Sequence, residues 1–175
     1  MELAVKLFCQ SIADLVSRPA VREAGGDELT DVQFACLRFI YLHKEPSIGS
    51  VAEGLSISNA ASTKLIQRLV VKGLVQRRED PIDRRVLQLV ITEDGEALIR
   101  KIQSLQEEYF ARILNDMSFE SRESLFEGLR GFLAAALKTP ESVELVCQRC
   151  GWSHLSDCPG NQLYLRMTGK EKTVV

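Results

Sequence analysis

The sequence has no long apolar run and few aromatic residues. No stretch approaches the eighteen or so residues of a membrane-spanning helix, and the opening MELAVKLF lacks the basic segment of a secretory signal. We therefore expect a cytoplasmic protein with no membrane partner. Aromatic residues make up 6% of the 175 residues and apolar residues 45%, which predicts a globular chain with an aliphatic core.

The motifs of the common enzyme classes are also missing. The sequence contains no glycine-rich phosphate loop, no nucleophile with a matching base, and no pair of carboxylates with an evident role. We expect the protein not to be an enzyme.

Charge is distributed unevenly along the chain. The net charge is −2, yet residues 58–85 hold seven Lys or Arg against three Asp or Glu, a local charge of +4 that leaves −6 on the remainder. A basic segment on an acidic body is typical of a protein that binds a polyanion.

Apolar periodicity predicts a mainly α fold. Helical spacing covers 3–17, 30–43, 47–55, 58–72 and two long segments after 92 and 118, and 74–78 and 85–91 alternate as strands around a turn at 80–83. This order is typical of a winged helix-turn-helix, at about 30–92, flanked by long helices within a domain of 1–140. Pro140 is expected to end the regular pattern, leaving 141–175 as a separate tail. The expected helix caps are Thr30, Ser47, Ser58, Thr92 and Ser118.

The stretches GLSISNAASTKLIQRLVVKGLV, at 54–75, and LVQRREDPIDRRVLQLVITEDG, at 74–95, resemble the MarR family of transcriptional regulators. The second has the Asp-Arg-Arg of the family's wing, an alternating strand and then Thr-x-x-Gly. The resemblance implies a DNA-binding regulator, usually a repressor that responds to a ligand, metal or oxidant. It also implies that Asp83 orients Arg85 toward the minor groove, with Arg84 on a phosphate.

The residue types suit DNA recognition. The helix after Ser58 should read the major groove with its exposed side chains, because Asn and Gln pair with adenine edges and Lys pairs with guanine or phosphate. Arg77 and Arg78 lie on opposite strand faces, so only one of them should touch DNA. The candidate DNA-binding residues are Ser58, Asn59, Thr63, Lys64, Gln67, Arg77, Asp83, Arg84 and Arg85.

The flanking helices predict a homodimer. Their apolar stripes, in 3–16 and 125–137, would be exposed on a single chain. A symmetric dimer would read a pseudo-palindromic duplex with half-sites about 10 bp apart. The alternative is a winged-helix module that binds protein and not DNA.

The tail contains CQRCGWSHLSDCPG, in which Cys147, Cys150, His154 and Cys158 could bind one Zn²⁺. We expect Cys147 to Gly151 to form a metal knuckle and the metal to stabilise the tail, ahead of a sensing role. An iron–sulfur cluster, a thiol–disulfide sensor and a disordered tail with incidental cysteines are the alternatives. Cys9 and Cys36 are expected to be small core residues.

Overall fold

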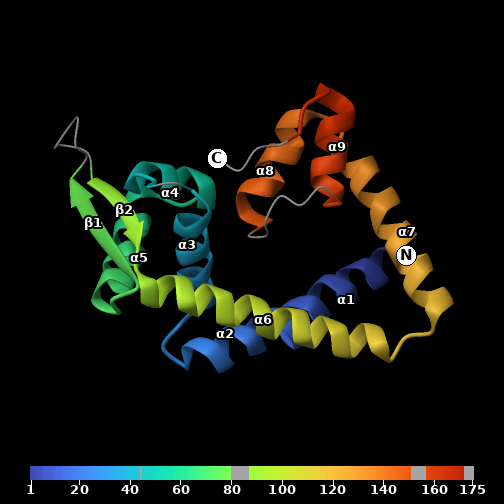
Figure 1. Cartoon of the computed structure of the whole chain (residues 1–175), viewed down its shortest axis with the longest axis horizontal. Coiled ribbons are helices and arrows are strands. Elements are labelled where there is room, and N and C mark those ends of the chain that lie inside the picture. The colour runs from blue at the N-terminus through green and yellow to red at the C-terminus, as the bar shows by residue number, and fades with distance from the viewer. Residues whose placement is uncertain (44, 80–86, 151–156, 172–175) are drawn as a thin grey trace. The chain divides into compact units, whose positions relative to one another are not determined.

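The computed structural model describes residues 1–43, 45–79, 87–150 and 157–171, except the side chains of 148 and 149 (Figure 1). The chain divides into two compact units, Met1–Asp116 and Met117–Val175. The predicted division lay at 140, because the helix after Ser118 was grouped with the dimer helices. That grouping concerns a dimer and stays a prediction.

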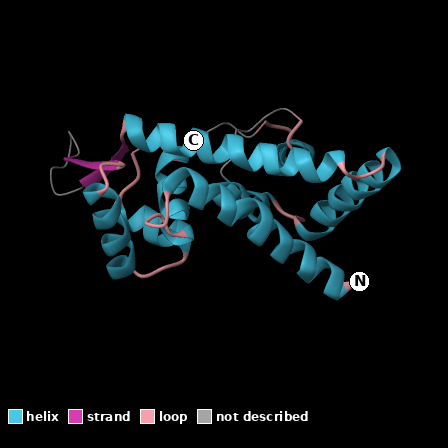
Figure 2. Cartoon of the chain, turned by 90° about the horizontal axis from the view of Figure 1, so that it is seen from below, coloured by secondary structure: helices cyan, strands magenta, loops and turns pink. Residues whose placement is uncertain are grey.

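The first unit begins with a helical segment that is longer than the single helix expected over 3–17 and is divided into three elements. Helix α1 (Glu2–Ile12) passes into a π-helical turn η1 (Ala13–Ser17) and then α2 (Arg18–Gly25). The remaining helices of the unit are α3 (Asp31–Leu42), α4 (Ile48–Leu55), α5 (Asn59–Val71) and α6 (Glu93–Asn115), and the strands are β1 (Val75–Glu79) and β2 (Leu87–Ile91). Figure 2 shows how strongly helices dominate this chain, in agreement with the predicted mainly α class.

The predicted caps are confirmed. Thr30, Ser47, Ser58, Thr92 and Ser118 each accept a hydrogen bond from a backbone N–H of the first helical turn. Thr30 and Gln33 do so reciprocally, which satisfies two amides that the helix cannot pair internally. These short-range bonds explain why the helix starts could be placed from sequence.

One aliphatic core holds the winged helix together. Leu37 of α3, Ile66 and Leu69 of α5, Leu89 of β2 and Ile99 of α6 are almost completely buried in it. Helix α6 passes from the end of β2 over α3 and packs on α2 (Figure 1). The strands pair antiparallel, with Val75 opposite Ile91 and Arg77 opposite Leu89.

The second unit contains α7 (Phe119–Ala136), α8 (Pro140–Cys150) and α9 (Pro159–Thr168). The expectation that regular structure ends at Pro140 was wrong, because proline is well suited to the first turn of a helix, where its missing N–H has no partner to lose. Thr139 Oγ1 accepts from the Ser142 N–H at 3.2 Å and so begins α8. The segment is therefore packed and helical, with Val143 and Asn161 buried.

Candidate nucleic-acid interface

The helix-turn-helix is formed by α4 and α5. Ser56 closes α4 in the left-handed region, with φ of 55°, and the Ile57 N–H donates to the Ala52 carbonyl at 2.9 Å. Ser58 then caps α5. Three residues thus turn the chain between the two helices, as the sequence predicted.

Helix α5 has a buried face and a polar exposed face. Ser62, Ile66 and Leu69 have no exposed surface, and Ser62 Oγ donates to the Ile48 carbonyl of α4 at 3.0 Å. This bond fixes the rotation of α5 against α4. The exposed face carries Asn59, Ala60, Thr63, Lys64 and Gln67, which includes every predicted DNA-reading residue of the helix. Thr63 Oγ1 donates to the Asn59 carbonyl at 2.8 Å, so its methyl is the group left to meet a partner.

Glycine allows the close packing of α4 on α3. A Cβ added at Gly54 would lie 2.5 Å from Phe39 Cζ and closer still to its Cε2. The Phe39 ring has little room to move away, because only 6% of its surface is exposed. Atoms of real side chains do not approach so closely. Sequence reasoning missed this contact, because Phe39 and Gly54 belong to separate helices.

The wing is anchored at its base to the end of α5. Thr92 Oγ1 accepts from the Gly95 N–H at 3.1 Å and donates to the Gly73 carbonyl at 2.7 Å, while the Thr92 N–H donates to the Leu74 carbonyl at 3.1 Å. A Cβ at Gly95 would clash with the Leu74 carbonyl oxygen and lie 2.7 Å from Ile91 Cγ1. The Thr-x-x-Gly pattern therefore joins β2, α5 and α6 at one point.

A second anchor comes from the segment before α4. The Leu89 N–H donates to the Pro46 carbonyl at 3.0 Å, and Ser47 forms an isolated antiparallel bridge with Gln88. Arg78 pairs with Glu45, whose φ is 49°. Sequence reasoning missed this isolated bridge, because a single bridged residue shows no alternation.

The arginines of the wing have different surroundings. Arg78 is engaged by Glu45, and Arg77 lies exposed on the same strand face as Val75, opposite Leu89. This arrangement agrees with the choice of Arg77 over Arg78 as the DNA contact, which stays a prediction. Asp83, Arg84 and Arg85 lie outside the described residues.

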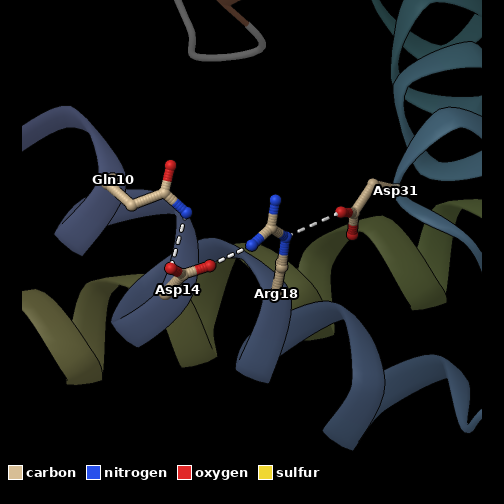
Figure 3. A network of polar contacts seen from close by, with 4 residues as sticks. All are labelled: Gln10, Asp14, Arg18 and Asp31. Carbon is tan, nitrogen blue, oxygen red and sulfur yellow. Dashed lines mark hydrogen bonds and ion pairs between the residues drawn. The ribbon is translucent and has the colours of Figure 1, made fainter. Parts of the chain in front are cut away.

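A polar network joins the N-terminal helices to the first turn of α3 (Figure 3). The Arg18 guanidinium contacts Asp14 and donates through Nε to Asp31 at 3.2 Å, and Gln10 Nε2 donates to Asp14 at 2.6 Å. All three charged side chains are about half exposed, so each pair contributes well under about 1 kcal/mol. The network positions the N-terminal segment on the winged helix more than it stabilises the fold.

A surface hollow lies beside this network. Asp14, Arg18, Pro19, Arg22, Glu23 and Tyr109 line it. Tyr109 donates to Glu23, and this hydrogen bond raises the pKa of the phenol above its usual value. The hollow thus contains charges of both signs from α2 and η1, beside the neutral phenol of Tyr109 on α6.

The metal candidates are brought together in part. Cys147 and Cys150 lie in the last turn of α8, so the expected knuckle at this C-x2-C is replaced by helix over the described residues. Cys158 caps α9. Within the described residues the structure contains no group of three His, Cys, Asp or Glu side chains placed to hold a metal ion. His154 lies outside them, so the four-ligand set stays a prediction.

The geometry defines a winged helix-turn-helix, and the comparisons agree with it. Residues 29–87, less than half of the chain, match the family model described as MarR family. The match includes part of the stretch in which the wing pattern indicated this resemblance. In the part of the chain that the structure describes, no helix has the length and apolar character needed to cross a membrane.

Three similar proteins illustrate the extent of the match. The Bacillus subtilis uncharacterized HTH-type transcriptional regulator YsmB is 33% identical over 93 residues, which are 53% of this chain and 60% of YsmB. The B. subtilis HTH-type transcriptional repressor MdtR is 24% identical over 78% of this chain and 88% of its own. The crystal structure of transcriptional regulator Tm0710 from Thermotoga maritima is 28% identical, with a TM-score of 0.62 over 77% of this chain and 92% of that one. This chain therefore spans less than two thirds of YsmB, and the names of the three matched proteins describe them as transcriptional regulators or a repressor.

Proposed function

We propose that the protein is a sequence-specific DNA-binding transcriptional regulator. The observation that carries the proposal is the exposed polar face of α5, whose opposite face is locked in the core of a MarR-family winged helix. A helix presented in this way fits the major groove, and its N-terminal side chains reach the base edges. Repression is the favoured mode, in keeping with the named activity of MdtR.

The DNA contacts proposed are those of the sequence. Lys64 and Gln67 would read the major groove, Ser58 would present its helix N-terminus to a phosphate, and Arg85 would enter the minor groove beside the wing. Lys64 and Gln67 are exposed on the same helix, which supports their pairing in this role.

Duplex binding tests the proposal directly. A random-sequence duplex pool is enriched on the full-length protein, and affinity for the selected duplex is measured by fluorescence anisotropy across a salt series. Loss of one phosphate contact in Lys64→Ala or Arg85→Ala should reduce the salt slope by about 0.9, and loss of a base contact should cost about 1–3 kcal/mol. Lys101→Ala, an exposed lysine of α6, is the matched control and should leave both quantities unchanged.

The competing function is protein recognition by the winged helix. If enrichment yields no preferred duplex and the residual binding is equal in Lys64→Ala, Arg85→Ala and Lys101→Ala, the regulator proposal fails and the interaction module becomes the better account.

We further propose that the regulator is a homodimer. Helix α1 has no buried residue, its Leu3 and Leu7 are 80% and 68% exposed, and Leu15 of η1 is 62% exposed. Helix α7 likewise exposes Phe119 and Phe132 at 66% and 58%. Apolar side chains in such numbers mark protein interfaces. Sedimentation equilibrium should give twice the chain mass, and a monomer at micromolar concentration would contradict the proposal.

A signal would act on the dimer by shifting the spacing of the two α5 helices. The mixed-charge hollow beside Tyr109 is the surface we propose for a small-molecule effector. For the tail we propose Zn²⁺ bound by Cys147, Cys150, His154 and Cys158, with an iron–sulfur cluster as the alternative. Metal analysis of the purified protein, with an absorption spectrum, separates the two.

A further inference from the structure

Two thiols of the second unit converge on one glycine. A Cβ added at Gly160 of α9 would lie 3.5 Å from Cys147 Sγ and 3.8 Å from Cys158 Sγ, with fully buried Val143 at 4.0 Å. One sulfur comes from the last turn of α8, and the other comes from the cap of α9. Because Gly160 has no side chain, the space between the two sulfurs stays open.

The other cysteines are placed differently. Cys9 is exposed in the first unit, so the expectation that it is a core residue was wrong, and Cys150 is exposed at the end of α8. Cys36 is buried in the core, where burial raises its pKa to about 12, so at neutral pH it remains a thiol of low reactivity. Cys147 and Cys158 are both half-buried, and both sulfurs lie within 3.8 Å of the position that a Cβ on Gly160 would occupy.

We propose that Cys147 and Cys158 form a dithiol that a hydroperoxide oxidises to a disulfide linking α8 to α9. The thiolate of one cysteine attacks the peroxide O–O bond, giving a sulfenic acid and releasing an alcohol or water. The thiol of the other cysteine then attacks the sulfenic sulfur, forming the S–S bond and releasing water. Two electrons pass to the peroxide, and the protein loses two hydrogen atoms.

The packing favours this reaction. A disulfide needs Cβ atoms about 3.5–4.5 Å apart, and α8 and α9 already pack against one another. Tyr164 Oη of α9 donates to Glu144 of α8 at 3.2 Å, which holds the two helices in contact on another side. The two sulfurs thus lie on neighbouring, packed helices within 3.8 Å of a common point at Gly160.

The inference does not depend on the zinc proposal. The predicted metal site needs Cys150 and His154 in addition to the other two ligands. A disulfide needs only the sulfurs of Cys147 and Cys158. The two states exclude each other, because thiolates that enter a disulfide cannot hold the metal. Oxidation of a zinc-loaded protein would therefore release the ion.

The test oxidises the full-length protein with hydrogen peroxide, both zinc-loaded and chelator-treated, after removal of reductant. We expect an intact mass lower by two hydrogen atoms, a Cys147–Cys158 cross-linked peptide on non-reducing digestion, and reversal by dithiothreitol. Cys147→Ser and Cys158→Ser should abolish the cross-link and leave the remaining cysteine as a sulfenic acid that dimedone traps. Cys150→Ser and Cys9→Ser are the matched controls and should form the cross-link as the parent does.

Several results would overturn the inference. These are a cross-link that maps to Cys150, a disulfide between chains, or chelator-treated protein whose Cys147 and Cys158 both stay reduced while peroxide is consumed. The circular dichroism spectrum of each serine variant must match that of the parent, which shows that the variant has folded. The cross-link in Cys150→Ser and Cys9→Ser tests the proposed pair without a substitution at Cys147 or Cys158. Metal content is measured separately, so a failure of the zinc proposal is distinguishable from a failure of this one.

Discussion

Gly54→Ala should destabilise the helix-turn-helix even though alanine is the better helix former. In an unobstructed helix the change would contribute about 0.8–1.0 kcal/mol of stability. Here the new Cβ meets the ring of Phe39, which is buried and stacks on His43 with ring centroids 4.0 Å apart. Overpacking of a filled core costs about 1–3 kcal/mol, and at a separation of 2.5 Å or less we expect the upper part of that range. The net loss should be about 1–2 kcal/mol.

The same helix provides the control. A Cβ at Gly49 would meet only Ser47 Oγ, at an ordinary 3.7 Å, so Gly49→Ala should stabilise by up to about 1 kcal/mol. The free energy of unfolding of both variants is measured by urea denaturation followed by circular dichroism. Gly54→Ala should also cost less in a Phe39→Leu background, because the shorter side chain leaves room. Equal effects of the two alanines, or no coupling to Phe39, would refute the packing argument.

Two further predictions concern Thr92 and Cys36. Thr92→Ala should lower the free energy of unfolding by about 1–2 kcal/mol, because it removes the α6 cap and the hydrogen bond to Gly73. Thr92→Ser keeps the hydroxyl and should recover most of this loss. Equal losses in the two variants would show that the hydroxyl is unimportant. The buried Cys36 thiol keeps its proton up to about pH 12, while the unfolded chain releases it above its lower, ordinary pKa. Its contribution to stability is therefore complete below the unfolded pKa and falls by up to about 1.4 kcal/mol per pH unit as the pH rises through that window. Urea unfolding of the parent and of Cys36→Ala at about pH 8 and pH 10 should show the gap between them shrinking, and a constant gap would contradict the assignment.

The sequence predicted what depends on neighbouring residues. Helix starts were correct because a Ser or Thr cap and the amide it binds are about three residues apart, and the buried face of α5 was correct because its period is local. The backbone contacts of Pro46 and Ser47 with β2 and the contact of Gly54 with Phe39 were missed, since each depends on residues distant in the chain. Pro140 was misread because proline interrupts a helix at an interior position but is favoured in its first turn. The helix that contains Val143 was therefore not predicted.

The anchors of the wing connect DNA recognition to the rest of the first unit. Thr92 is the cap of α6 and also holds the carbonyls that follow α5, so the N-terminus of α6 cannot move without the base of the wing. Farther along the same helix, Tyr109 binds Glu23 of α2. Helix α6 is continuous over this distance, and a shift of α2 against it would therefore reach α5 and the wing together. Under the proposed function, a signal received at the N-terminal helices would need no separate path to α5, because α6 packs on α2 and is bonded through its cap Thr92 to the Gly73 carbonyl just after α5.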